Sequence, residues 1–266
     1  MLVPVQPSGM KPPLFFVHGM YGVMPLGGIF APVLGEDQPF YAVQANGIDG
    51  RGTVIDDFGQ MVLRYLEEIE NVRPTAPIRI GGMCTGCMVA IEIARKLQEK
   101  GRQTGPVILA DPSPLPIGYD KQKNAVDPRD AQTAQQLYQQ ARRMLLDYAS
   151  HPYNRMPFDH RDPKQVHNAS LAGVGSLIAI ARHVPSPYPG SAELVISAEH
   201  APGFFHPQMP WHKLLPGPRT VHVLPGRHRE LFRGGRDEVA RLLKFMLERP
   251  LPPDVSAEDR ADASVA

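Results

Sequence analysis

Short runs of apolar residues alternate along the chain with longer stretches in which apolar residues recur every three or four positions. Most of the short runs are apolar on both faces, which is typical of strands in a parallel sheet that helices cover on both sides. We predict strands over 13–19, 39–46, 77–83, 105–112, 192–199 and 220–226. Helical periodicity predicts helices over 55–72, 86–100, 164–183 and 236–248. This alternation predicts an α/β fold with a mostly parallel, doubly wound sheet.

The alternation is interrupted between about 113 and 163, where no strand pattern occurs. An amphipathic stretch, "AQQLYQQARRMLLDYA", lies there between proline-rich segments, which predicts a helical lid inserted after a central strand. The last segment, 251–266, has almost nothing to bury and is predicted to be a disordered tail. We therefore expect one domain over 1–250 that includes the lid.

Composition mainly excludes certain partners and targeting segments. The formal net charge is +1, so no global field favours nucleic acid or an anionic membrane as a partner. The N-terminus lacks the basic and apolar regions of a signal peptide, and no apolar run reaches the roughly 18 to 20 residues of a membrane span. A disulfide between two cysteines three positions apart would not cross-link a large domain. Such cysteine usage fits a protein of a reducing compartment. We expect a cytoplasmic protein, and the sequence leaves its oligomeric state open.

Both cysteines lie in "RIGGMCTGCMVA", residues 79–90, where a strand runs through a G-M-C-T-G turn into a helix. This is the pattern of a nucleophile elbow, which holds a nucleophile at the tip of a sharp turn and needs small residues on either side. Three other interpretations of Cys84 stay open. With Cys87 it matches a redox C-x-x-C; it could belong to a metal site, although no second ligand pair is present; or it is a packed core residue.

The partners of a nucleophile in this fold follow later strands, in the order acid and then histidine. Asp111 ends the strand over 105–112, and His228 lies in a glycine-containing loop after the last strand. Glu199 follows the penultimate strand and is the alternative acid, whereas His222 lies within the last strand and is expected to be structural. We predict a Cys84, His228 and Asp111 triad that performs acyl transfer.

An oxyanion formed during acyl transfer needs two backbone N–H donors. One is expected from Thr85, directly after the nucleophile, and the other from Met20 or Tyr21 in the "HGMYG" loop after the first predicted strand. We predict no metal and no cofactor bound by the protein itself.

Several segments resemble the thioesterase domains that release products from nonribosomal peptide synthetases and polyketide synthases, within the α/β-hydrolase superfamily. They are "LVPVQPSGMKPPLFFVHGMYG", "FYAVQANGIDG", "APIRIGGMCTGCMVAIEIARKLQEKG", "VILADPSP" and "LPGRHRELF". The resemblance covers roughly residues 3–250 and is weak through the lid. It implies an α/β-hydrolase fold and a substrate carried on the phosphopantetheine of an acyl or peptidyl carrier protein.

The chain departs from this family at two positions. Most members have serine where Cys84 stands, and glycine where Cys87 stands. Cysteine keeps the acyl-enzyme a thioester, which stays open to amines, thiols and hydroxyls as well as water. This favours either release by hydrolysis or cyclisation, or transfer of acyl or aminoacyl groups between carriers. Cys87 is interpreted as a small buried residue, with a reversible disulfide to Cys84 as the other possibility.

Basic residues gather around the predicted histidine. They form either a docking surface for an acidic carrier protein or the pantetheine phosphate, or an ordinary solvated helix face. The residues are Arg227, Arg229, Arg233, Arg236, Arg241 and Lys244. A third functional class, a redox or structural C-x-x-C protein without acyl chemistry, stays open from the residues alone.

Overall fold

Seven strands form one sheet within the part of the chain that the computed structural model describes, residues 2–25, 27–73, 75, 77–112, 131–152, 154–205 and 211–251. The strands are β1 (Leu2–Gln6), β2 (Leu14–Val17), β3 (Phe40–Val43), β4 (Arg79–Met83), β5 (Val107–Ala110), β6 (Ala192–Ser197) and β7 (Arg219–Leu224). Their order across the sheet is β1-β3-β2-β4-β5-β6-β7. All six predicted strands are present, and β4 lies between β2 and β5 at the centre.

Strands β2 to β7 pair in parallel, and only β1 is antiparallel to its neighbour β3. This confirms the predicted mostly parallel sheet. Strand β1 was not predicted, because Pro4 interrupts a short apolar stretch. An edge strand tolerates proline, since one side of its backbone has no neighbour to which it must donate.

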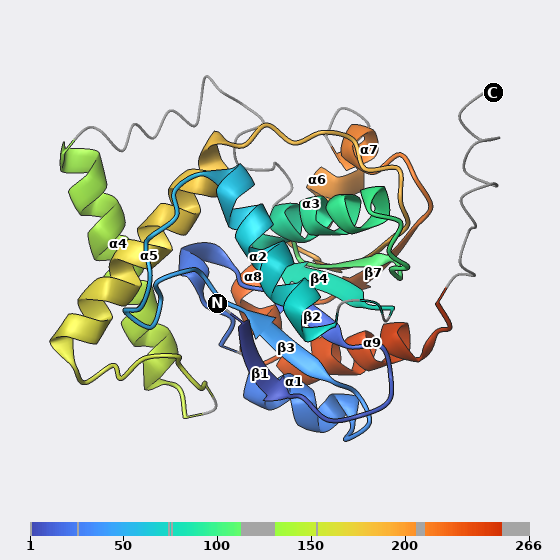
Figure 1. Cartoon of the computed structure of the whole chain (residues 1–266), viewed down its shortest axis with the longest axis horizontal. Helices are drawn as coiled ribbons and strands as arrows, with labels where there is room; N and C mark the ends of the chain where they lie inside the picture. The colour runs from blue at the N-terminus through green and yellow to red at the C-terminus, as the bar shows by residue number, and fades with distance from the viewer. Residues whose placement is uncertain are drawn as a thin grey trace.

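Helices cover both faces of the sheet (Figure 1). Helices α1 (Gly27–Leu34) and α9 (Arg236–Glu248) pack on one face, and α2 (Phe58–Val72) and α3 (Gly86–Glu99) pack on the other. Along β2, Phe15 and Val17 point toward α2 and α3, and Leu14 and Phe16 point toward α1 and α9. All four side chains are fully buried, which explains the absence of polar alternation in the sequence.

The sequence predicted α2, α3 and α9 but not α1, which begins with a glycine pair and contains Pro32. Tertiary burial of its apolar side chains, Phe30 and Leu34 among them, stabilises a helix that intrinsic propensity disfavours. Four further helical segments are short. They are η1 (Met20–Gly22), α6 (Ala201–Phe205), α7 (Trp211–Leu214) and α8 (His228–Leu231).

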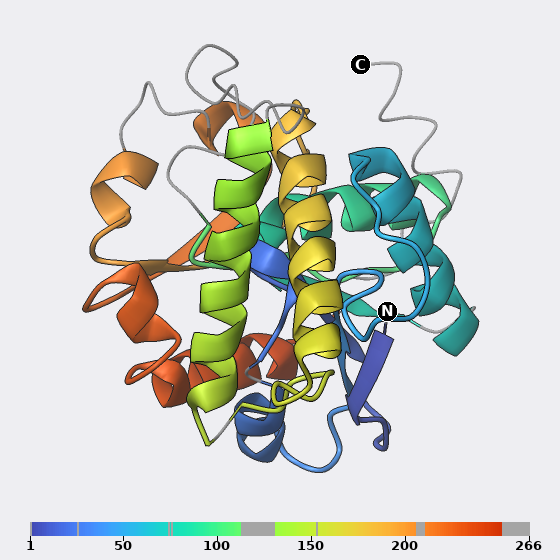
Figure 2. The ribbon, with the colours of Figure 1, turned by 90° about the vertical axis from the view of Figure 1, so that its left-hand side faces the viewer.

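Two long helices, α4 (Ala131–Ser150) and α5 (Pro163–Arg182), run side by side at one end of the molecule (Figure 2, green and yellow). The hydroxyl of Tyr138 on α4 lies 2.8 Å from Nδ1 of His167 on α5, and Leu145 and Val166 share a small apolar cluster. The helix predicted over 164–183 is confirmed as α5. Residues 113–130 of the predicted lid and residues 252–266 of the predicted tail lie outside the described residues.

None of the helices in the described ranges combines the length and the apolar character that crossing a bilayer requires.

Candidate functional site

The turn between β4 and α3 holds Cys84 in a backbone conformation that residues with a Cβ rarely adopt, with φ at 52°. The two glycines around it are sterically required. A Cβ on Gly82 would lie 2.5 Å from the carbonyl oxygen of Gly86, and a Cβ on Gly86 would overlap the carbonyl oxygen of His18. The Cys84 amide donates to the carbonyl of Ala110 on β5 at 2.9 Å, which fixes the turn to the neighbouring strand.

We expect Gly86→Ala to lower the free energy of unfolding by about 3 kcal/mol or more, because the clashing atom is backbone that cannot move without displacing β2. Urea denaturation followed by circular dichroism measures this loss. Gly234→Ala is the matched control, because a Cβ there meets no heavy atom within 4 Å and its effect should stay within about 0.5 kcal/mol. Equal stability of the two variants would contradict this account of the turn.

Asp111 and His228, which are 117 positions apart in the chain, meet beside this turn. Asp111 follows β5, is fully buried and also has a left-handed backbone, with φ at 48°. Its Oδ2 lies 2.7 Å from Nδ1 of His228, and its Oδ1 accepts from the amide of Ser197 at 2.7 Å. With Nδ1 engaged, Nε2 is the ring nitrogen left for Cys84, which lines the same cavity and raises the pKa of the ring.

Glu199 contacts the same histidine in a different way. Its Oε2 accepts from the backbone amide of His228 at 2.9 Å and so holds the start of α8, whereas the ring bonds to Asp111. His222 lies apart from the site, 3.8 Å from Glu193 and edge-on to Phe245.

His200 is a neighbour that the sequence analysis overlooked. Its ring stacks on that of His228 at 5.1 Å between centroids, and its Nδ1 lies 3.3 Å from Oδ1 of Asp111. The signal was available, because His200 directly follows Glu199 after a predicted strand.

Opposing effects determine the proton affinity of His228. Burial of the ring lowers its pKa, but hydrogen bonds with Asp111 and Cys84 and the negative charges of these groups raise the pKa to about 10.

The raised pKa predicts how stability depends on pH. In the unfolded chain the imidazole titrates near 6.5. Protonated His228 therefore stabilises the folded state fully below about pH 6.5, and this contribution is lost as the pH rises through about 10. We expect the difference in unfolding free energy between wild type and His228→Gln to shrink between pH 6.5 and 10 in urea titrations. A difference that stays constant or grows over this range would contradict the prediction.

The loop after β2 faces the turn that holds Cys84. Tyr21 in η1 has a left-handed backbone, with φ at 64°, and its hydroxyl donates to Gln140 of α4 at 3.3 Å. His18 is fully buried beneath the loop, with Nδ1 2.8 Å from the Gly19 carbonyl and Nε2 2.8 Å from the Tyr65 hydroxyl. Burial lowers the pKa of His18 to about 4, so the ring is neutral and positions the loop.

A cavity of about 650 Å³ opens above Cys84. Its walls come from the η1 loop, the β4 turn, α4 of the lid and the segment from α8 to the start of α9. Apolar side chains near the cysteine include Met83, Met144 and Phe232. The sequence-predicted residues Cys84, His228, Met20 and Tyr21 all line this cavity, while Asp111 is buried behind His228. Thr85 is also buried, at the start of α3.

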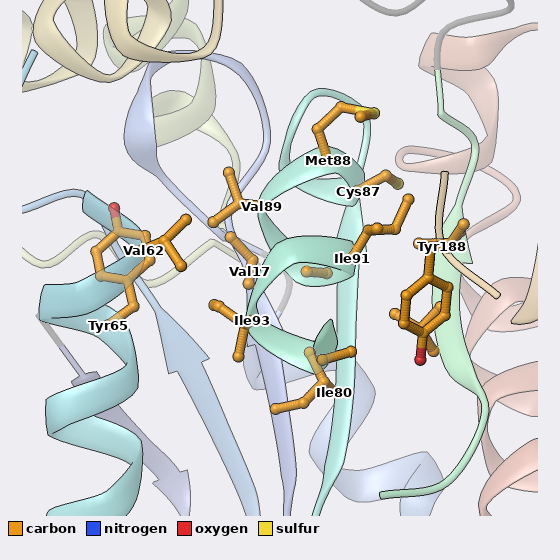
Figure 3. Close-up of a cluster of buried hydrophobic side chains, with 14 of the residues drawn as sticks. Val17, Val62, Tyr65, Ile80, Cys87, Met88, Val89, Ile91, Ile93 and Tyr188 are labelled. Atoms are coloured by element: carbon orange, nitrogen blue, oxygen red, sulfur yellow. The ribbon is translucent and has the colours of Figure 1, made fainter. Parts of the chain in front are cut away.

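Cys87 belongs to the core. It is fully buried among the apolar residues between α3 and the sheet (Figure 3), and its Sγ donates to the carbonyl of Gly82 at 3.3 Å. Burial raises the pKa of the Cys87 thiol well above its usual value, so this sulfur stays a thiol. Both cysteines are free thiols.

Asp111, His200 and His228 offer three ligand atoms within 4.8 Å of one another, the spacing of a metal site. A metal bound to all three would have to replace the 2.7 Å contact between Asp111 and His228. The hydrogen-bond geometry therefore fits an acid–histidine pair better than a metal centre.

Three of the six basic residues predicted around His228 line the cavity. Arg229, Arg233 and Arg236 line the cavity, whereas the exposed Arg241 lies on α9 and pairs with Glu238 at 3.6 Å. Arg143 of α4 joins the cavity wall from the lid side. The helical spacing of Gln140, Arg143 and Met144 was a signal for this face that the sequence analysis did not use.

Comparison with known proteins supports one family. A family model described as "Thioesterase domain" matches residues 12–246. Malpinin synthetase from Mortierella alpina is 34% identical over 110 residues, which are 41% of this chain and 1% of that protein. Chondramide synthase from Chondromyces crocatus is 33% identical over 129 residues, 47% of this chain and 3% of that protein. The chain thus spans a very small part of these relatives.

Solved structures agree with the fold. A covalent complex of the NocB thioesterase domain with a fluorophosphonate nocardicin G analog covers 94% of this chain and 100% of its own, with a TM-score of 0.68 and 20% identity. The Vlm2 thioesterase domain bound with a dodecadepsipeptide covers 95% and 100%, with a TM-score of 0.70 and 21% identity. The sheet order, the helical layers and the family match lead to one conclusion: this chain belongs to the thioesterase-domain family and has the α/β-hydrolase fold.

Proposed function

We propose that the protein cleaves an acyl or peptidyl thioester, carried on the phosphopantetheine of a carrier protein, through an acyl-enzyme on Cys84. One observation carries the proposal. Cys84 lies at the tip of a strained turn and lines the cavity together with His228, whose ring contacts buried Asp111. A left-handed cysteine costs roughly 1–3 kcal/mol and persists where surrounding structure enforces it, as at active sites.

In the first step the Cys84 sulfur attacks the carbonyl carbon of the substrate thioester. His228 holds the thiol proton at Nε2, and Asp111 orients the ring and stabilises its charged form. The carbon–sulfur bond to the pantetheine arm then breaks, and His228 returns the proton to the leaving thiolate. One thioester replaces another, so this step is nearly balanced in free energy.

The negative oxygen that forms in this step needs donors fixed in advance. We assign the backbone N–H of Thr85 and that of Met20 or Tyr21. Support comes from their position, since Thr85 begins α3 and the η1 loop lines the cavity opposite Cys84. The neutral His18 and the Tyr21 contact with Gln140 hold this loop.

In the second step an acceptor attacks the acyl carbon and His228 removes the acceptor's proton. The bond between that carbon and the Cys84 sulfur then breaks, and the sulfur takes the proton back from His228, which restores the free enzyme. Water gives hydrolysis, and an amine or hydroxyl within the same chain gives cyclisation. A second carrier thiol or an external amine gives acyl or aminoacyl transfer instead. The cysteine itself favours this second candidate function, since a thioester reacts more readily with amines than an ester does.

A carrier protein is the proposed partner, because the curated relatives are synthetases and one is described as a dimodular nonribosomal peptide synthase from Bacillus subtilis, 32% identical over 133 residues. No cofactor bound by the protein itself enters these steps. A cytoplasmic location remains a prediction.

Turnover of acyl thioesters of N-acetylcysteamine tests the proposal. We expect thiol release that depends on Cys84, with the acyl group recovered as free acid, ring, or the amide of an added amine. These products distinguish hydrolysis, cyclisation and transfer. A protein that releases no thiol but changes its cysteine oxidation state would support the redox interpretation, which the complete burial of Cys87 disfavours.

A further inference from the structure

The cavity above Cys84 carries an unbalanced positive charge. Among the described residues that line it are four arginines, and none is an aspartate or a glutamate. We call this set the arginine rim: Arg143, Arg229, Arg233 and Arg236. It comes from two sides, because Arg143 lies on α4 of the lid and the other three follow His228 on the opposite wall.

Only part of this charge is compensated. Arg233 bridges the two walls through Asp147 of α4, at 2.5 Å. Arg143 and Arg229 form no ion pair with any residue in the described ranges, and both are exposed at the cavity. Among the described residues, no carboxylate pairs with these two guanidinium groups, which leaves them to a bound molecule.

The arginine rim and Cys84 line the same cavity. Tyr148, one helical turn beyond Met144, also lines the cavity. Burial raises the pKa of its hydroxyl to about 12; the charge of Cys84 adds to the rise, and Arg229 and Arg233 oppose it. Tyr148, Cys84 and these arginines thus line one cavity and act on one another electrostatically.

We infer that the acyl chain of the substrate carries an anionic group, a carboxylate, which Arg143 and Arg229 bind while the thioester carbonyl is at Cys84. This rests on the proposed function and names its substrate class. Guanidinium groups bind carboxylates through paired, charge-assisted hydrogen bonds. The apolar wall of Met83, Met144 and Phe232 accommodates the methylenes between the carbonyl and the charge.

Binding of unreactive analogues tests the inference independently of turnover. Three thioethers are compared by calorimetry: the butyl and the 3-carboxypropyl thioethers of N-acetylcysteamine, and the butyl thioether of phosphopantetheine. The first two differ only in the terminal group, which is a methyl in one and a carboxylate in the other. We expect wild type to bind the carboxypropyl compound about tenfold more tightly than the butyl compound. Higher salt should reduce this ratio, because the rim is exposed.

The double variant Arg143→Gln with Arg229→Gln should bring the ratio close to one. Arg142→Gln is the matched control, because Arg142 neighbours Arg143 on α4, is equally exposed and does not line the cavity, so the ratio should persist.

Equal binding of the carboxypropyl and butyl compounds by wild type overturns the inference. A preference that depends on the arginines only for the phosphopantetheine compound also overturns it and assigns the rim to the carrier arm. Failure of the proposed function would appear elsewhere, as absence of turnover of the corresponding thioesters.

Discussion

Cys84→Ala is expected to lower kcat for acyl-thioester cleavage by at least about 10⁴-fold, because the variant has no atom that can accept the acyl group. Fold and substrate binding should survive, since the side chain is partly exposed at the cavity and the change removes a single sulfur atom. The fall in kcat is measured as slower release of N-acetylcysteamine, which a thiol reagent detects.

Two further variants show whether the sulfur itself is responsible. Cys84→Ser retains a nucleophile at the same turn, so we expect slower but measurable cleavage with a smaller share of amide product when an amine is added. Cys87→Ala removes the other sulfur, which is fully buried away from the cavity, and should leave turnover within about threefold of wild type. Loss of activity in Cys87→Ala with full activity in Cys84→Ala would reverse the proposed roles.

Asp111→Asn is expected to lower kcat by about 10³–10⁴-fold with little change in KM. The carboxylate accepts from the His228 ring and from the Ser197 amide at once, and an amide at this position can keep one of these bonds while presenting an N–H to the other. Retention of the Ser197 bond turns the N–H toward Nδ1 of His228 and selects the wrong tautomer. The pKa of His228 should also fall, which an NMR titration of the ring detects.

Glu199→Gln provides the comparison for Asp111→Asn. Glu199 accepts only from the backbone amide of His228 in the described contacts, and a glutamine oxygen can accept the same bond. We expect a loss of less than about tenfold. A larger loss in Glu199→Gln than in Asp111→Asn would make Glu199 the acid of the site.

The hydrophobic pattern was sufficient for the sheet and its covering helices, because each buried strand and each amphipathic helix leaves a local signal. It was insufficient where local propensity and tertiary burial disagree. Strand β1 contains Pro4 and lies at an edge, and α1 contains Pro32, yet both are held by contacts with distant segments. No pattern within either segment records those contacts.

At the site, the turn chemistry and the order of strand ends were readable from sequence. The sequence favoured Asp111 over Glu199 as the acid, but both follow strands of a parallel sheet, so the alternative stayed open. The difference depends on which oxygen reaches the ring and which reaches the backbone, and this is set by how α8 begins after β7.

Only part of the arginine rim could also be predicted from the sequence. Arg229, Arg233 and Arg236 cluster in sequence, but Arg143 approaches from a lid helix almost ninety positions earlier. The cavity that joins them has α4 on one side and the segment from α8 to the start of α9 on the other.

The most direct test is intact-mass analysis of the protein after brief exposure to an acyl thioester, followed by peptide mapping. We expect a mass increase equal to one acyl group, sensitive to hydroxylamine and located on the peptide that contains Cys84, in wild type and not in Cys84→Ala. An adduct that persists in Cys84→Ala, or that maps to another peptide, would contradict the proposed acyl-enzyme.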